Sequence, residues 1–566
     1  MPGIQTNNSS SEALNAVQQL AELGANQRDA TLVGSGLRLF ERPLAPNAAN
    51  EASALVSPFA LGRAYELLLA PPARRKTGSH LTPESIARNL VALMPQAQVG
   101  DRVLDPAVGG AAFLLAAADQ LVDAGAAPQD VVGQLFGIDI DLGAVAVAEA
   151  ALALWALDQG LEPTSLPNVQ AGDGLLDALP TVERVVGNPP FLNQLRSTSS
   201  HTADRRAQLR ERWGPLVTAY TDDAWLFLAA GVDALTVSGS LAMVQPVSIL
   251  AARHAQAVRE QVHADASVTS IWVGRDRVFD AAVQVCGLVV ERGAAPRVQS
   301  MQRRVGANFD MVDTFAGAVR PHEWGNAAAA AVGVPRVQLA STAGIIGDLA
   351  TATAGFRDQF YGFVPFVAEN PTDHVAQDKR RLVTVGMIDV LTLGWGSRSF
   401  KFAKRDFTRP VVDLTALETG DPRLADWVRA RLRPKILMAS QTRVVEVIVD
   451  ADGDCIPATP VLSIEPHSLD GEELWMLAAA LSAPAISAQF AGAQFGTAMA
   501  ITALKVSARD VLSAPLPTQV EPWQAAAKLL QIQSGDLEEF GALMGQAYEC
   551  DPPGLLQWWL QRVPNR

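Results

Sequence analysis

Residues 101–121 read DRVLDPAVGGAAFLLAAADQL, and this stretch decides the fold class. A short apolar run ends in Asp105, a loop with two glycines follows, and a long apolar segment with helical character comes next. The same order of strand, loop and helix returns in residues 133–157, and short strand-like runs follow in residues 169–191. Short β-branched runs that alternate with helical segments indicate a parallel sheet covered by helices on both faces. The sequence therefore predicts an α/β fold.

Polar side chains follow the predicted strands where each strand ends. Asp105, Asp139, Asp173 and Asn188 hold these positions in four successive strands. In open α/β sheets, ligands bind at the carboxyl ends of the strands. The Gly109-Gly110 loop would bring backbone amides and a helix N-terminus close to a ligand. A tight turn or a surface aspartate explains any one of these features, but together they predict a nucleoside-sized pocket.

The fourth strand, residues 182–187, is followed by Asn188-Pro189-Pro190-Phe191. Neither proline has a backbone N–H, so neither can continue a sheet ladder and the strand must stop at Asn188. Taken alone, this tetrapeptide is also compatible with a simple turn between two elements.

The order of the motifs resembles the gamma-class N6-adenine DNA methyltransferases of restriction-modification and phage-defence systems. The resemblance covers roughly residues 58–295 and consists of GSHLTP (78–83), DPAVGGAAFLL (105–115), GID (137–139), GD (172–173) and NPPF (188–191). It implies a Rossmann-like fold that uses S-adenosylmethionine. It also implies transfer of the cofactor's methyl group to the amino group of an adenine in DNA.

The same resemblance assigns residues to the cofactor. Thr82 and Pro83 would border its methionine end, and Asp139 would hold its ribose. The remaining cofactor residues would be the loop residues Asp105, Ala107 and Gly109, the adenine-amine acceptor Asp173, and Ile140 and Pro189 on the faces of that adenine. One departure concerns Ala111, which stands where the family has a glycine and would be strained at positive φ.

For the target base, the resemblance implies two oxygen acceptors and two aromatic faces. The side-chain oxygen of Asn188 and the carbonyl of Pro189 would accept the two amine hydrogens, and Pro190 would help to keep that carbonyl rigid. Phe191 would stack on a base swung out of the duplex, and Phe279 would stack on its opposite face. Ordinary core packing is an alternative role for Phe279.

A domain boundary is expected near residues 325–340, which divides the chain into an N-terminal helical segment (1–57), a methyltransferase domain (58–330) and a mixed α+β target-recognition domain (331–566). The strongest basic and aromatic cluster lies in the last part, in residues 392–410. Its candidate DNA-binding residues are Trp395, Arg398, Lys401, Lys404 and Arg405. A half-buried strand with solvated charges is the alternative. Asp452-Gly453 predicts a hairpin.

Bulk properties limit the other function classes. The chain has 566 residues and a formal net charge of −14, so clustered basic residues must supply any site for double-stranded DNA. No apolar run spans a bilayer and no signal sequence is evident, so we expect a cytoplasmic protein without membrane association. Its three cysteines lie far apart and predict buried thiols, with neither a disulfide framework nor a metal site.

Site-specific DNA adenine methylation, solitary or within a defence system, is the preferred function. RNA-base or protein-glutamine methylation is an alternative because the same tetrapeptide serves those amines. A DNA-binding subunit with impaired catalysis is another alternative, motivated by Ala111. No lysine has an acidic residue two positions before it, so the commonest restriction nuclease core is not predicted. A separate restriction or defence subunit and the oligomeric state stay open.

Overall fold

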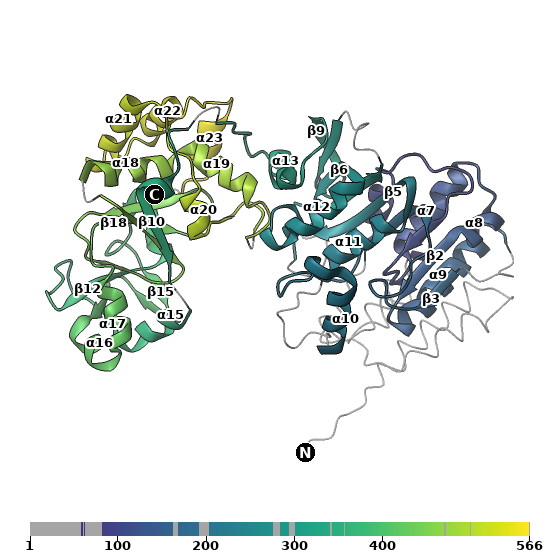
Figure 1. Ribbon diagram of the computed structural model, residues 1–566, viewed down its shortest axis with the longest axis horizontal. Helices are drawn as coiled ribbons and strands as arrows, with labels where there is room; N and C mark the ends of the chain where they lie inside the picture. The colour runs from purple at the N-terminus through teal and green to yellow at the C-terminus, as the bar shows by residue number, and fades with distance from the viewer. Residues whose placement is uncertain are drawn as a thin grey trace, which may run out of the picture. The chain divides into compact units, whose positions relative to one another are not determined.

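The computed structural model describes residues 58–59, 61–62, 82–161, 168–191, 203–275, 283–293, 300–339, 342–355, 357–468, 471–498 and 500–564. The chain divides into two compact units, the first ending at Val332 and the second beginning at Gly333 (Figure 1). The N-terminal helical segment expected at residues 1–57 and the residue Phe279 lie outside the described residues.

The first unit contains a nine-stranded sheet with the order β3-β2-β1-β4-β5-β7-β6-β8-β9. Its strands are β1 (Val103–Asp105), β2 (Leu135–Asp139), β3 (Asn168–Ala171), β4 (Val182–Gly187), β5 (Leu235–Pro246), β6 (Ala266–Val273), β7 (Val285–Arg292), β8 (Ser300–Val305) and β9 (Asp310–Ala316). Strands β1 to β5 are mutually parallel, as the sequence predicts for the first four, whereas β7 runs antiparallel to both β5 and β6.

Helices cover both faces of this sheet. They are α6 (Glu84–Val91), α7 (Ala112–Asp123), α8 (Pro128–Gln134), α9 (Leu142–Asp158), α10 (Ala203–Trp213), α11 (Asp223–Asp233), α12 (Gln256–Asp265) and α13 (Trp324–Ala331). Alternate strand residues serve opposite faces. Val186 and Val244 share a core with α6, α7 and α9, while Val185 and Met243 lie against Gly231 of α11. The predicted α/β fold with two covered faces is confirmed.

Helix boundaries follow local chemistry. The α7 segment is rich in Ala and Leu, which favour helix, and it ends where Gly125 adopts a φ of 97°. Asp222 is the N-cap of helix α11, and its carboxylate accepts a hydrogen bond from the Ala224 N–H. Most residues of α7 and of α11 are buried, and nearly all of these buried residues are apolar.

The second unit combines two four-stranded sheets with a helical layer. One sheet has the order β10-β22-β18-β20 and the other β11-β17-β12-β21. Their strands are β10 (Ala350–Ala354), β22 (Val461–Pro466), β18 (Lys435–Ala439), β20 (Glu446–Asp450), β11 (Val367–Glu369), β17 (Pro410–Asp413), β12 (Lys379–Val383) and β21 (Cys455–Pro457). Three two-stranded pairs are β13 (Ile388–Asp389) with β14 (Thr392–Leu393), β15 (Phe400–Phe402) with β16 (Arg405–Phe407), and β19 (Gln441–Thr442) with β23 (Leu504–Lys505).

The helices of the second unit are α14 (Ile346–Leu349), α15 (Arg357–Phe363), α16 (Leu414–Gly420), α17 (Pro422–Arg429), α18 (Gly471–Ser482), α19 (Pro484–Ala493), α20 (Ala508–Leu512), α21 (Val520–Gln531), α22 (Leu537–Ala547) and α23 (Leu555–Leu560). The apolar sides of α18, α19, α21, α22 and α23 share one core with the sheet that contains β18. This arrangement is the mixed α+β architecture expected for residues 331–566.

Within the described residues, no single helix is long and apolar enough to cross a membrane, and only α18 with α19, bent by 53°, would pass by length and composition. Both helices are largely buried in the core of the second unit. Cys286, Cys455 and Cys550 are buried and form no disulfide, as expected.

Candidate active site at the strand tips

The carboxyl ends of β1, β2, β3 and β4 lie along one edge of the sheet. Strands β3, β2, β1 and β4 are neighbours in this order and run parallel. Asp105 and Asp139 end their strands, Asp173 follows β3 by two residues, and Asn188 comes directly after β4. The four residues singled out in the sequence therefore occupy one edge, because adjacent parallel strands end side by side.

The glycine loop is tied to both neighbouring acids. The Ala107 N–H donates to Asp105 Oδ1 at 3.0 Å, and the Gly109 N–H donates to Asp139 Oδ2 at 3.0 Å. Gly109 has a φ of 50°, a conformation that favours glycine. These bonds place the loop backbone directly against the carboxylate expected to hold the ribose.

Burial dominates the electrostatics of both acids. It raises the pKa of Asp105 to about 8, although the Ala107 N–H opposes the change and the charge of Asp139 adds to it. It also raises the pKa of Asp139 to about 6, with the N–H groups of Asp141 and Gly109 opposing. Two carboxylates held close together at a sheet edge gain by hydrogen bonding to a ligand that donates, such as a ribose hydroxyl.

The loop also approaches a segment that the sequence did not single out. A Cβ on Gly110 would lie 2.5 Å from the Cα of Gly62, and a Cβ on Gly62 would lie 2.9 Å from the Cα of Gly110. Two glycine backbones therefore touch here. Ala111 follows in a left-handed conformation, with φ 62° and ψ 17°, and it caps α7. The positive φ expected to strain this alanine is present.

Asn188 is oriented by Thr82, which lies two residues before α6. Its Nδ2 donates to Thr82 Oγ1 at 3.0 Å, and Thr82 is buried. Because the amide nitrogen is committed to Thr82, the other end of the amide is the oxygen, an acceptor only. Pro189 is buried, while Pro190 and Phe191 are half-buried, and Phe191 packs against the core of the first unit. Pro83 is the N-cap of α6.

The third strand tip carries a further contact. Leu175 N–H donates to Asp173 Oδ1 at 3.0 Å, and Arg205 of α10 forms an ion pair with Asp173 Oδ2. Arg205 was not among the residues found from the sequence, because it lies 32 residues away from Asp173 along the chain. Ile140 exposes 70% of its surface directly after β2, which is unusual for isoleucine and suits an apolar ligand.

The candidate DNA-binding residues of the second unit take different positions. Lys401, Lys404 and Arg405 are exposed on the hairpin of β15 and β16, whose turn residues Ala403 and Lys404 have φ values of 48° and 69°. Trp395 is half-buried, and its Nε1–H donates to the Pro410 carbonyl at 2.9 Å. Trp395 is therefore anchored in the unit by its indole group.

Arg398 is an exposed arginine held in place. Its Nη2 donates to Asp389 Oδ2 at 2.6 Å and to the Gly386 carbonyl at 3.2 Å. Its guanidinium lies 5.1 Å from the ring centroid of Phe400. Such contacts reduce the conformational entropy that binding would otherwise cost.

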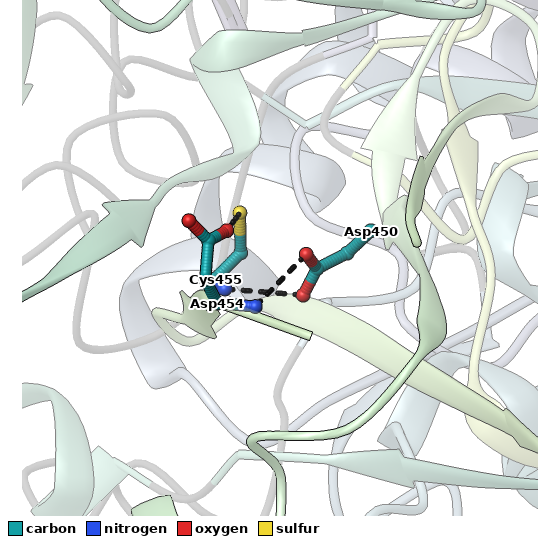
Figure 2. A group of neighbouring side chains, drawn as sticks. All are labelled: Asp450, Asp454 and Cys455. Atoms are coloured by element: carbon teal, nitrogen blue, oxygen red, sulfur yellow. Dashed lines mark hydrogen bonds between the residues drawn. The ribbon is translucent and has the colours of Figure 1, made fainter. Parts of the chain in front are cut away.

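The predicted hairpin at Asp452-Gly453 is wrong. Strand β20 pairs with β18, whereas β21 pairs with β12 in the other sheet, so the turn leads from one sheet to the next. Asp450 replaces the missing ladder by accepting hydrogen bonds from the N–H groups of Asp454 and Cys455, at 3.1 Å each (Figure 2).

Asp450, Asp454 and Cys455 bring together ligand atoms of the kinds that bind metals. Asp450 also forms an ion pair with the fully buried Lys435. The Asp450 carboxylate thus contacts one cation and two backbone N–H groups. These contacts explain why the three side chains lie together: they close the turn that connects the two sheets.

Comparisons with known proteins identify a matching family and similar solved structures. Residues 57–304 match the model of the family described as N-6 DNA methylase. No curated protein matches the chain. The structure is similar to that of the type IIL restriction-modification enzyme MmeI, with a TM-score of 0.59 and 13% identity over 99% of this chain and 91% of that chain.

Two further solved structures match at lower TM-scores. The type IIG restriction endonuclease BpuSI has a TM-score of 0.43 and 12% identity over 99% of this chain and 78% of that one. A modification subunit of a putative type I restriction enzyme from Vibrio vulnificus has a TM-score of 0.34 and 19% identity over 44% and 51%. The MmeI likeness shows the fold, and the family match covers the motifs at the strand tips. Residues 57–304 are therefore an N6-adenine DNA methyltransferase domain of the N-6 DNA methylase family.

Proposed function

We propose that this protein methylates the N6 amino group of an adenine swung out of double-stranded DNA, at sites that the second unit selects. The observation that carries the proposal is the amide of Asn188, which Thr82 orients at the tip of β4, two strands away from Asp139. S-adenosylmethionine would supply a methyl group on a sulfonium, which a localised nitrogen lone pair can attack.

The residues at the strand tips fit this cofactor. The carboxylate of Asp139 can accept hydrogen bonds from ribose hydroxyls, and the backbone at Gly109 leaves room beside it because no side chain projects there. The exposed Ile140 offers an apolar surface for one face of the cofactor's adenine. Asp105, Ala107, Thr82 and Pro83 would complete the pocket.

For the chemistry, the amine of adenine is a poor nucleophile because its lone pair is delocalised into the ring. The Asn188 oxygen and the Pro189 carbonyl would accept its two hydrogens and favour the form in which the lone pair is localised. The nitrogen would form a bond to the methyl carbon as the bond from sulfur to that carbon breaks, S-adenosylhomocysteine would leave as the thioether, and the nitrogen would release one proton to water. Phe191 would hold the base by stacking.

DNA is preferred over RNA or protein because of the second unit. Its hairpin of β15 and β16 exposes Lys401, Lys404 and Arg405, although the chain as a whole has a net charge of −14. Arg398, two residues before β15, is held in place by its hydrogen bond to Asp389. MmeI, which shares the fold, was solved in complex with DNA. A restriction or defence partner forms part of the proposal.

The test is transfer of a tritiated methyl group from S-adenosylmethionine to duplex DNA, RNA and protein, followed by hydrolysis of the product. We expect label in N6-methyladenine from DNA alone. Label in RNA or in glutamine would favour the alternative methyltransferases. Binding of DNA without any transfer would favour a catalytically impaired subunit.

A further inference from the structure

Arg205 lies between two acids beneath the third strand tip. Its Nη1 forms an ion pair with Asp173 Oδ2, and its Nη2 lies 3.7 Å from Asp223 Oδ2 on the first turn of α11. The side chains of Arg205, Asp173 and Asp223 expose only 18%, 14% and 1%. A guanidinium shielded from water to this degree interacts with its partners more strongly than a surface ion pair does.

Two other side chains of α10 reach the same loop. Trp213 Nε1–H donates to the Leu175 carbonyl at 2.9 Å, and Arg212 Nη1 donates to the Leu176 carbonyl at 3.1 Å. Helix α10 is thus attached at three points to residues 173–176. The position of Arg205 is therefore part of a built contact between α10 and the loop after β3.

The local charges explain what Arg205 does for Asp173. Asp177 also lies close by, since its Oδ2 accepts the N–H of Asp173 at 2.7 Å. Without the guanidinium, the shielded Asp173 and Asp223 would be left with no cation between them and with the exposed Asp177 beside Asp173, and the repulsion among these carboxylates would favour a neutral Asp173. A neutral carboxyl carries a hydrogen and can donate, whereas an ionised one only accepts.

We propose that Arg205 is a positioning residue that holds Asp173 as an ionised acceptor for the adenine amino group of the cofactor, and that it thereby sets the preference for that base. The proposal rests on the cofactor role given to Asp173 under the proposed function. Arg205 need not touch the cofactor, because it acts through the carboxylate of Asp173.

The experiment compares two ligands that differ in one group. S-adenosylhomocysteine carries the 6-amino group, and S-inosylhomocysteine carries an oxygen in its place. Dissociation constants for both are measured by calorimetry on the full chain for the wild type and for Arg205→Ala, Arg205→Lys and Asp173→Asn. Arg210→Ala is the matched control, since Arg210 is exposed on the same helix.

We expect Arg205→Ala to weaken S-adenosylhomocysteine binding about tenfold and to narrow its advantage over the inosyl compound. Arg205→Lys should restore part of both, because a positive charge returns, and Arg210→Ala should bind as the wild type does. With DNA and saturating S-adenosylmethionine, kcat of Arg205→Ala should stay within about threefold of the wild-type value, while KM for the cofactor rises.

Three outcomes would overturn the proposal: tighter S-adenosylhomocysteine binding by Arg205→Ala, unchanged binding, or equal weakening for both ligands, as a purely structural role predicts. If Asp173→Asn weakens binding while Arg205→Ala does not, the role of Asp173 stands and that of Arg205 fails. A wild-type protein that binds neither ligand would instead contradict the proposed function itself.

Discussion

At the scale of single residues, the site depends on how hydrogen bonds orient the acceptor oxygens. The hydrogen bond from Asn188 Nδ2 to Thr82 Oγ1 fixes the rotation of the amide and therefore the position of its oxygen, which is the acceptor. Thr82 and Asn188 are 106 residues apart in the chain, yet both were singled out from their motifs. What the motifs could not show is that one orients the other.

Asn188→Ala should lower methyl transfer at least 100-fold, because the target amine loses one of its two acceptors. Binding of S-adenosylhomocysteine should change less than threefold, because Asn188 is assigned to the target base. Thr82→Val should reduce the single-turnover rate about tenfold, because the amide would lose its partner. Normal turnover by Asn188→Ala in single-turnover assays would rule out the assignment.

Asp105 makes a prediction about pH. Burial raises its pKa to about 8, far above the ordinary value for a carboxyl group, so the folded protein binds this proton more tightly than the unfolded chain does. The free energy of unfolding should therefore fall as pH rises from about 4 to about 8. Asp105→Asn keeps an oxygen for the Ala107 N–H and carries no charge.

Relative to wild type, Asp105→Asn should gain stability with increasing pH, on the order of a few kcal/mol at pH 8. Thermal unfolding of both proteins without cofactor, between pH 5 and pH 8, measures this difference. A difference that does not change with pH would show that Asp105 does not titrate in this range.

At the scale of elements, the glycine loop shows how a backbone contact selects residues. The Cβ of an alanine at position 110 would lie 2.5 Å from the Cα of Gly62, and no side chain there can turn away. Ala111, by contrast, keeps a methyl group at a φ of 62° and is fully buried. The family pattern drew attention to Ala111, but the tighter position is Gly110.

Gly110→Ala should destabilise the first unit by several kcal/mol, because the clash involves backbone on both sides. Ala111→Gly is its matched partner: relief of about 1 kcal/mol of strain offsets the loss of a buried methyl worth about 0.8 kcal/mol. Its stability should thus change by less than about 1 kcal/mol, and its S-adenosylhomocysteine affinity by less than threefold. A large gain in affinity would show that Ala111 does obstruct the pocket.

The hairpin of β15 and β16 and the neighbouring Arg398 should contribute differently to DNA binding. Arg398 is held by Asp389 and Phe400, which suits a contact to one base edge, whereas Lys404 is exposed at the turn and suits a phosphate. Arg398→Ala should relax the methylated sequence at one position in modified-base sequencing. Lys404→Ala should weaken DNA binding on all sequences and reduce the salt slope by about 1. Equal effects of both variants on every site would contradict this division.

At the scale of the whole molecule, each unit has a hydrophobic core of its own, and we expect each to unfold as a unit. A substitution of Lys435 can be used to destabilise the second unit alone. It is fully buried and paired with Asp450, so Lys435→Met leaves a buried carboxylate without its cation.

In calorimetry, Lys435→Met should destabilise the second unit by about 3–5 kcal/mol and leave the first unit unchanged. S-adenosylhomocysteine should raise the unfolding temperature of the first unit only, because a ligand stabilises the part of the protein that binds it. Adding Asp450→Asn to Lys435→Met should recover much of the loss. If calorimetry shows a single transition, and both the Lys435→Met substitution and S-adenosylhomocysteine shift its temperature, the two units unfold together.

The sequence by itself indicated that the first four strands, β1 to β4, belong to a parallel sheet and that a polar residue lies at the tip of each. These follow from local periodicity and from the rule that parallel neighbours end at one edge, so Asp105, Asp139, Asp173 and Asn188 can be identified from the sequence alone. Only the tertiary structure decided the contacts of Arg205 with Asp173 and of Gly62 with Gly110. It also decided that the strands flanking Asp452-Gly453 join different sheets. In each of these cases the partners are far apart in sequence or are chosen among several competing strands, and local preferences carry no information about which pairing has the lower free energy.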